Sequence, residues 1–244
     1  MGKKKLIIAC LAITMVTFSS ISIYANDNQG KFFIQNPATL SSNGIDNIAI
    51  ENQEESNATK AEIEEQVHQR EKEAAAAAKA AAVAAKKKAQ EKYLNGLAHY
   101  ICSVNNNISI ETATKYITYF VSASKTYGID EKLIMALAQK ESTFRSTSSN
   151  SGGYKGMMQT SDGITKAAGY EVEDIFDPQV AIKVGARYLN YKMDEFGSKR
   201  LALTAYNQGS GSVNSGNYTT GFATVVLGYY NNIENYLENN GYTE

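Results

Sequence analysis

The sequence predicts a mainly α-helical globular domain, preceded by a long Ala/Lys-rich helix and a flexible linker. Three observations lead to this fold class. Apolar residues in the C-terminal part recur at the spacing of amphipathic helices, without the alternation typical of strands. Residues 60–92 are mostly Ala, Glu, Lys and Gln and contain no Gly or Pro, as expected of a helix. Residues 26–59 are largely polar and lack a sustained apolar period, which favours a linker.

The first 25 residues have the pattern of an export signal. Lys3-Lys4-Lys5 precedes the apolar run Leu6–Phe18, and Ala25 ends a stretch of small residues. An uncleaved membrane anchor and a lipoprotein signal with Cys10 are the alternatives. Each of the three delivers the following residues outside the cytoplasm, either secreted or membrane-anchored through this segment. We therefore expect an extracytoplasmic protein.

The segment 60–96 is expected to form a helical stalk. An alanine-rich face buries little area, which favours a solitary, semi-rigid helix over a packed bundle. The cluster Lys86-Lys87-Lys88 is either a solvated helix end or a site of attraction to anionic polymers.

Composition excludes several classes of function. A formal net charge of −1 over 244 residues gives no electrostatic basis for binding nucleic acid. Two cysteines and two histidines are too few for a disulfide scaffold or a His-based metal centre, so we expect no metal and no cofactor. After cleavage at Ala25, Cys102 is the one remaining thiol, expected as a small buried apolar residue.

From residue 97 to 244 the composition is that of a globular domain. A first helix carries Ile117 and Phe120 and ends near Gly128, and a second is capped by Asp130. Asp177-Pro178 opens a third helix, because proline is favoured at the first helical position. The remaining expected elements are an irregular hairpin within Gly152–Gln159, a short helix Leu201–Tyr206 and a last helix Thr224–Leu237.

Glu141 is the strongest candidate for a catalytic residue. It follows Leu133 and Leu137 by eight and four residues, which places its carboxylate on the apolar face at the helix C-terminus. Burial and the helix dipole both penalise its charged form and raise its pKa, as general-acid catalysis requires. The structural alternative is a solvated Glu, or one paired with Lys140 or Arg145.

Two further motifs suit recognition of a neutral, hydroxyl-rich ligand. In Gly156-Met157-Met158-Gln159, the Gln159 amide offers a donor and an acceptor. In Ala205-Tyr206-Asn207-Gln208-Gly209, Tyr206 can stack on a sugar ring and Asn207 can bond an N-acetyl group. Residues 201–233 contain no charged side chain at all. The structural alternatives are a loop whose methionines fill the core and a helix C-cap with Gly209 in a left-handed conformation.

Taken in order, these motifs resemble the catalytic domain of soluble lytic transglycosylases, which is related to goose-type lysozyme. The match covers residues 108–233 and runs through Tyr127-Gly128-Ile129-Asp130, Ala136–Ser142, Gly156–Gln159, Phe176-Asp177-Pro178, Ala186–Leu189 and Ala205–Gly209. The resemblance implies a lysozyme-like fold with a cleft for the glycan strands of peptidoglycan. It implies the catalytic acid Glu141, oriented by Ser142, and a cleft lined by Met158, Gln159, Tyr206 and Asn207. It also implies a tyrosine of the last helix that faces Glu141, either Tyr229, which the spacing favours, or Tyr230.

The family reaction cleaves the bond from N-acetylmuramic acid to N-acetylglucosamine without water and forms a 1,6-anhydro sugar. A hydrolytic muramidase on the same fold is the rival, with Asp162 as a possible second carboxylate. Asp162 is equally a candidate cap for the turn Gly163-Ile164-Thr165. A non-catalytic, glycan-binding part of an envelope-spanning machine is the third interpretation, and a secretion or conjugation apparatus is a candidate partner.

Overall fold

The computed structural model describes the backbone of residues 42–243 and the side chains from residue 56 onward. The expected signal or anchor segment 1–25 and the start of the expected linker lie outside the described residues. The described residues fall into two units, which divide after residue 68. The second unit contains all of the helices α2 to α8.

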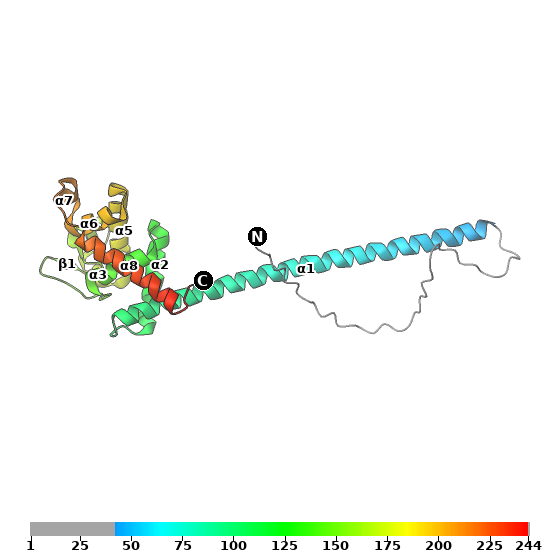
Figure 1. Ribbon diagram of the computed structural model, residues 1–244, viewed down its shortest axis with the longest axis horizontal. Helices are drawn as coiled ribbons and strands as arrows, with labels where there is room; N and C mark the ends of the chain where they lie inside the picture. Colours follow the sequence, from blue (N-terminus) through cyan, green and yellow to red (C-terminus); the bar gives the residue numbers. More distant parts are fainter. Residues whose placement is uncertain (1–41, 244) are drawn as a thin grey trace, which may run out of the picture. The chain divides into compact units, whose positions relative to one another are not determined.

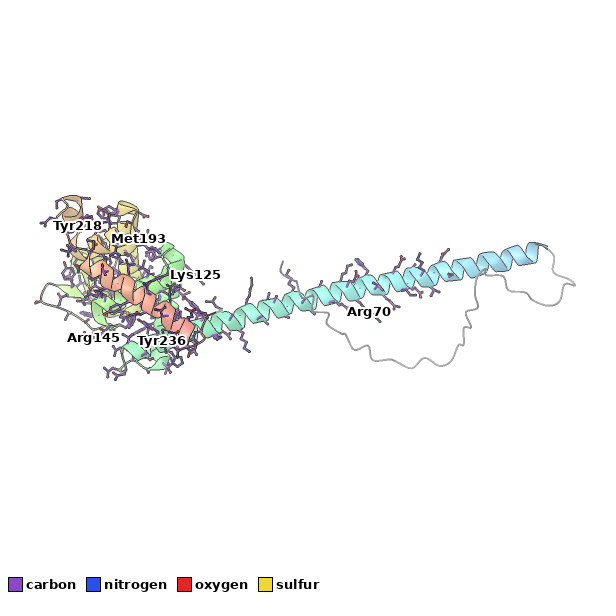
Figure 2. The ribbon with its side chains drawn as sticks, viewed as in Figure 1. Arg70, Lys125, Arg145, Met193, Tyr218 and Tyr236 are labelled. Carbon is purple, nitrogen blue, oxygen red and sulfur yellow. The ribbon has the colours of Figure 1, made fainter. Side chains whose placement is uncertain are left out.

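The first helix, α1 (Ser42–Val104), is 63 residues long and begins well before the expected stalk. Residues 42–59, expected as linker, are therefore helical. Residues 42–59 contain no proline and a single glycine, Gly44, so few residues in this stretch oppose helix formation. Side chains at 56–88 are all exposed, and Figure 2 shows those around Arg70 extending from the helix. No described helix is both long and apolar enough to cross a membrane.

The last turns of α1 belong to the core of the second unit. Leu97, Ala98 and Ile101 are fully buried, and the Tyr100 ring packs edge-on against Tyr236 at a centroid distance of 5.4 Å. The last turns of α1 are therefore part of the packed core, within the same helix as the residues expected to form the stalk.

Two capped helices follow α1. Helix α2 (Ile110–Tyr127) starts at Ser109, whose hydroxyl accepts a bond from the Thr112 amide, and ends at Gly128 in the left-handed region. Helix α3 (Glu131–Ser142) starts at Asp130, whose carboxylate accepts a bond from the Lys132 amide at 2.9 Å. Both ends expected from the sequence, Gly128 and Asp130, are confirmed.

Helix α3 is the centre of the domain. Its residues 133–138 are at most 1% exposed, so the helix is apolar around its whole circumference. Such a helix must be enclosed by others. It packs against α8, α2 and α5, as Figure 1 shows. The polar surface of α3 is therefore confined to the two ends of the helix.

A small hairpin and two short helices connect α3 to α5. The strands β1 (Tyr154–Lys155) and β2 (Thr160–Ser161) pair antiparallel, with Lys155 opposite Thr160. Helix α4 (Asp162–Ala167) and the 3₁₀ helix η1 (Val172–Phe176) follow. The hairpin was expected within 152–159, but its second strand lies just after Gln159.

Four helices complete the domain. Helix α5 (Pro178–Phe196) begins at the Asp177 cap and the proline that predicted it. Helices α6 (Lys199–Gln208), α7 (Ser210–Asn214) and α8 (Gly221–Asn239) follow. Helix α8 runs antiparallel to α3. The Phe222 ring near the start of α8 contacts the Lys140 ammonium near the end of α3, and Glu234 near the end of α8 forms an ion pair with Lys132 near the start of α3. The mainly α-helical fold predicted from the sequence is confirmed.

Candidate active site

Glu141 lies in the last turn of α3, where the chain changes direction sharply. The two residues after this helix, Thr143 and Phe144, have φ angles of 57° and 62°. Left-handed backbone is unfavourable for residues other than glycine, and such residues cluster at functional sites. Phe144 is held there by full burial and by an edge-on contact with Phe120 at 6.3 Å. The packing of Phe144 in the core therefore holds the end of α3 in place.

The carboxyl group of Glu141 is partly buried and accepts no hydrogen bond from any described side chain or amide. Loss of hydration raises its pKa from an ordinary 4.5 to about 7, against a smaller opposing effect of Lys140. No acidic side chain contributes to this shift. Glu141 is thus an isolated carboxylic acid that keeps its proton in about half of the molecules near neutral pH, which suits a general acid.

Two hydrogen bonds attach the loop 156–159 to the helices around Glu141. The Ser142 hydroxyl donates to the Met157 carbonyl at 2.7 Å, and the Tyr206 hydroxyl donates to the Met158 carbonyl at 2.9 Å. Tyr206 is buried, and this burial is the main reason that its pKa is raised. The charge of Glu141 raises the pKa of Tyr206 further. The phenol of Tyr206 therefore lies close to Glu141, and both hydroxyl groups hold the loop beside the acid.

The positions of Met158 and Gln159 do not agree with the cleft-lining role that was expected for them. Met158 is fully buried against α5 at Gly185, where an added Cβ would come within 2.6 Å of the Met158 side chain. The Gln159 amide donates to the carbonyls of Gly156 and Ser148, and its oxygen accepts from Asn150. Neither side chain has its polar or apolar surface available to line a cleft. They form the interior of the loop instead.

The same correction applies to Ser142 and to the ring of Tyr206, which are 3% and 8% exposed. Neither offers a surface on which a sugar ring could stack. Among the described contacts Ser142 has no hydrogen bond to the Glu141 side chain; its hydroxyl donates to the Met157 carbonyl instead, so the expected orienting role is not seen. Burial in the structure separates the supporting residues among the candidates from the exposed ones, which the sequence pattern does not do.

Asn207 is exposed at the end of α6 and is available to a ligand. The cap that follows is formed by Gly209 at φ 82° and ψ 154°, a conformation open essentially to glycine alone. The positive φ agrees with the glycine expected at this helix end, while the ψ of 154° differs from that of the left-handed helical conformation. Gln208, which the sequence analysis did not single out, donates to the Thr219 carbonyl and accepts from the Thr219 amide. This pair closes the loop that carries α7.

The expected tyrosine of the last helix is not among the described contacts of Glu141. Burial and, to a smaller extent, the nearby Tyr229 raise the pKa of Tyr100, whose hydroxyl donates to Gln139. The Tyr230 hydroxyl donates to the Asp130 carboxylate at 2.8 Å. The aromatic residue of α8 at the Glu141 end of α3 is Phe222, whose ring centre lies 5.4 Å from the Lys140 ammonium. The antiparallel packing of α8 against α3 determines which aromatic residue lies at this end. The spacing of residues along the sequence does not show how the two helices are aligned.

Asp162 is committed to a structural contact. Its carboxylate accepts a hydrogen bond from Lys155 at 2.8 Å, and about half of its side chain is exposed. It is the first residue of α4, while Ser161, and not Asp162 as expected, is the N-cap. Among the described residues, no group of three or more His, Cys, Asp or Glu gathers as metal ligands.

Comparison with known proteins agrees with this geometry. Residues 118–224 match the family model described as "Transglycosylase SLT domain". The chain is 33% identical over 151 residues to the "Membrane-bound lytic murein transglycosylase C" of Pectobacterium atrosepticum, covering 52% of this chain and 41% of that protein. It is 30% identical over 106 residues to the "Transglycosylase" of Enterobacteria phage PRD1, covering 43% and 39%.

Among solved structures, the 70-kDa soluble lytic transglycosylase of Escherichia coli matches with a TM-score of 0.43 and 25% identity, over 57% of this chain and 28% of that one. Residues 118–224 are therefore similar to the transglycosylase SLT domain, the family that the motifs of the sequence resemble. The matches span about two fifths or less of the length of the curated relatives.

Proposed function

We propose that the protein is a peptidoglycan lytic transglycosylase with Glu141 as its catalytic acid and base. The single observation that carries the proposal is the state of that carboxyl group. It is partly buried, accepts no hydrogen bond from a described residue and has a pKa raised to about 7. A structural carboxylate would be expected to have partners, because burying an unpaired charge is costly.

In the proposed reaction, Glu141 protonates the oxygen between N-acetylmuramic acid and N-acetylglucosamine. The N-acetyl group of the muramic acid stabilises the positive charge that develops at the anomeric carbon. The carboxylate of Glu141 then accepts the proton of the 6-hydroxyl as that oxygen bonds to the same carbon. The products are a 1,6-anhydro sugar and a released strand. A group with a pKa near the working pH can perform both transfers.

Hydrolysis by inversion would need a second carboxylate that activates water, roughly 6.5–9.5 Å from the acid. The candidate Asp162 is ion-paired with Lys155, and no acidic side chain contributes to the pKa of Glu141. Both observations favour the reaction that needs one carboxylate. A purely glycan-binding role does not explain a raised pKa on an unpartnered acid.

The experiment that tests the proposal is mass spectrometry of the fragments that the protein releases from purified peptidoglycan. Fragments that end in 1,6-anhydro-muramic acid support the transglycosylase. Fragments with a reducing end, one water heavier, would make the protein a muramidase. If no fragment is released by a folded protein that still binds glycan, a binding module is the better interpretation.

Peptidoglycan strands as the substrate also imply a place of action in the cell wall. Residues 60–92 of α1 are exposed nearly throughout, which supports a role as a spacer between the N-terminal segment and the catalytic domain. Deletion of 60–92 should then spare activity on soluble glycan and reduce it in the cell. Export, the state of the N-terminal segment and a partner apparatus stay predictions of the sequence.

A further inference from the structure

Residues 209–220, the connecting segment, join α6 to α8 and carry the short helix α7 (Figure 1). Both ends of this segment lie at the end of α3 that bears Glu141. Just before the segment, the charge of Glu141 raises the pKa of Tyr206, so these two groups lie close together. Just after it, the Phe222 ring contacts Lys140, which precedes Glu141 in the sequence. The connecting segment therefore begins and ends beside the candidate active site.

The backbone of the connecting segment does little to fix its own direction. Gly209 leaves α6 at φ 82° and ψ 154°, and Gly216 has a φ of 73°, values that are open mainly to glycine. Gln208 and Ser212 form hydrogen bonds between the segment and the end of α6. Val213 is the one buried side chain of this described segment. Attachments to a more distant helix are therefore needed to hold it in one position.

Three polar groups attach the connecting segment to α5. The Ser210 hydroxyl donates a hydrogen bond to the Glu195 carboxylate at 2.7 Å and accepts one from the Lys192 ammonium. Lys192 and Glu195 also form an ion pair at 3.0 Å. The three groups form a closed triangle, which we call the latch. Among the hydrogen bonds of the described residues 209–220, those of Ser210 reach a helix other than α6 and α8.

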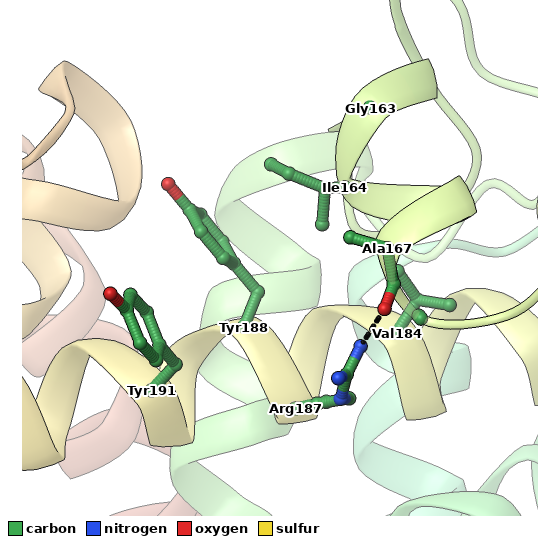
Figure 3. Close-up of a pocket in the computed structure, with 8 residues that line it drawn as sticks. Gly163, Ile164, Ala167, Val184, Arg187, Tyr188 and Tyr191 are labelled. Carbon is green, nitrogen blue, oxygen red and sulfur yellow. Dashed lines mark hydrogen bonds between the residues drawn. The ribbon is translucent and has the colours of Figure 1, made fainter.

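Lys192 is 5% exposed, although a lysine side chain is rarely buried without partners. Its ammonium lies 5.0 Å from the ring centre of Tyr188 and 4.8 Å from that of Tyr191, two tyrosines that Figure 3 shows on the same side of α5. The faces of these rings and the Glu195 carboxylate attract the cation and replace the water that it loses. A hydrogen bond from a charged, buried donor is stronger than a neutral one. The contact of Lys192 with Ser210 is therefore a strong attachment for the connecting segment.

We propose that the latch holds the connecting segment, and with it Asn207, in the position that binds the glycan strand beside Glu141. The proposal rests on the proposed function and adds positioning residues to it, namely Lys192, Glu195 and Ser210. With the latch intact, the segment is ordered before the substrate binds. With the latch broken, part of the binding energy is used to order the segment, so the apparent affinity for the strand falls.

The first test measures the cleavage of soluble glycan strands by the full chain and by its Ser210→Ala variant. The substitution should raise KM about threefold to tenfold, the effect of losing one hydrogen bond, and leave kcat unchanged. Ser210→Thr keeps the hydroxyl and should restore the wild-type KM. Ser215→Ala is the matched control, because it removes a hydroxyl of the same segment that donates to the Ser212 carbonyl within the segment. It should not change KM.

The second test needs no enzymatic activity. Hydrogen–deuterium exchange of the full chain measures how often the amides of the connecting segment open. Exchange in this segment should be faster in Ser210→Ala and in Lys192→Met, while the amides of α3 exchange as in the wild type. Lys192→Met keeps the length of the buried side chain and removes its charge, so the domain should still fold. Unchanged exchange in both variants would mean that the latch does not hold the segment.

A binding measurement separates this proposal from the catalytic one. In the Glu141→Gln background, the affinity for soluble glycan strands purified from peptidoglycan is measured with and without Ser210→Ala. Binding that is weaker by about threefold to tenfold supports the positioning role, even if the wild type releases no fragment. Unchanged affinity overturns that role and leaves the assignment of Glu141 untouched.

Two other results would also overturn the positioning role. One is a fall in kcat without a change in KM, and the other is faster exchange throughout α3, because both would indicate a general loss of structure. If the Glu141→Gln protein binds no glycan at all, the proposed function fails and the positioning role fails with it. The exchange experiment then still decides whether the latch holds the connecting segment.

Discussion

The two ends of α3 carry acidic residues in opposite environments. At the first end, Glu131 accepts hydrogen bonds from Tyr93 at 2.7 Å and from Ser124 at 3.1 Å. Asp130 accepts from Tyr230 and from the amide of Lys132. At the other end, Glu141 accepts none from a described residue, and burial raises its pKa to about 7.

The difference shows how one helix separates stability from chemistry. Carboxylates at a helix N-terminus are favoured by the dipole, and here they also join α1, α2 and α8 to α3. A carboxylate at the C-terminus meets the unfavourable end of the dipole and, in this structure, an incomplete shell of partners. The first arrangement stabilises the fold, while the second maintains a reactive acid at a cost in stability.

The largest expected effect distinguishes the two ends by the same substitution. Glu141→Gln should reduce the release of fragments from peptidoglycan by about 10³-fold, because it removes the proton donor and keeps the shape. Glu131→Gln is the matched control and should retain activity within a few-fold, since it lies at the partnered end. Equal activity of Glu141→Gln and wild type would remove Glu141 from the mechanism.

The raised pKa of Glu141 should also appear in the pH dependence of stability. Its folded-state pKa lies above the unfolded value of 4.5, so the folded state binds the proton more tightly and loses stability as the pH rises through about 7. Between about pH 4 and about pH 8 the loss from this group should be about 3 kcal/mol.

The Glu141→Gln variant does not have this titration. Its free energy of unfolding in denaturant, minus that of the wild type, should therefore increase by this amount over the same pH range. A difference that stays constant with pH would mean that Glu141 has an ordinary pKa in the folded protein.

A smaller effect is expected at the partnered end. Asp130→Ala removes the N-cap of α3 and the acceptor of the Tyr230 hydroxyl, so it should lower the free energy of unfolding by about 1–2 kcal/mol. Asp130→Asn keeps a capping oxygen and should recover most of this loss. Thermal and denaturant unfolding would measure both variants. If Asp130→Ala is as stable as wild type, the two ends of α3 do not differ as described.

The smallest effect is expected for Asp162→Asn. The ion pair with Lys155 is largely at the surface, so its loss should change stability by about 0.5 kcal/mol or less. Activity should stay within about twofold of wild type, because transglycosylation needs no second carboxylate. An activity loss as large as that of Glu141→Gln would identify Asp162 as the base of a hydrolase.

The sequence predicted the elements whose signals are local. Asp130, Gly128 and Asp177-Pro178 mark helix ends by caps that act within one turn, and the spacing from Leu133 to Glu141 placed the acid on its helix face. The environment that raises the pKa of Glu141 follows from that placement.

The rest depended on contacts between distant segments. Met158 is buried because α5 has Gly185 at that point, and a Cβ at Gly156 would come within 2.3 Å of the Ile175 carbonyl. Neither approach is visible in a local pattern. The contact of Phe222 of α8 with Lys140 of α3 likewise follows from helix packing. The helical start at Ser42 was missed because polar composition was interpreted as a linker.

The most direct test of the account is to measure the pKa of Glu141 itself. NMR titration of the side-chain carboxyl carbons, with the Glu141→Gln variant to assign the signal, gives this value in the intact protein. We predict a pKa of about 7, well above the ordinary value of 4.5. A value near the ordinary 4.5 would contradict it, because Glu141 would then be charged at neutral pH and unable to act as the acid.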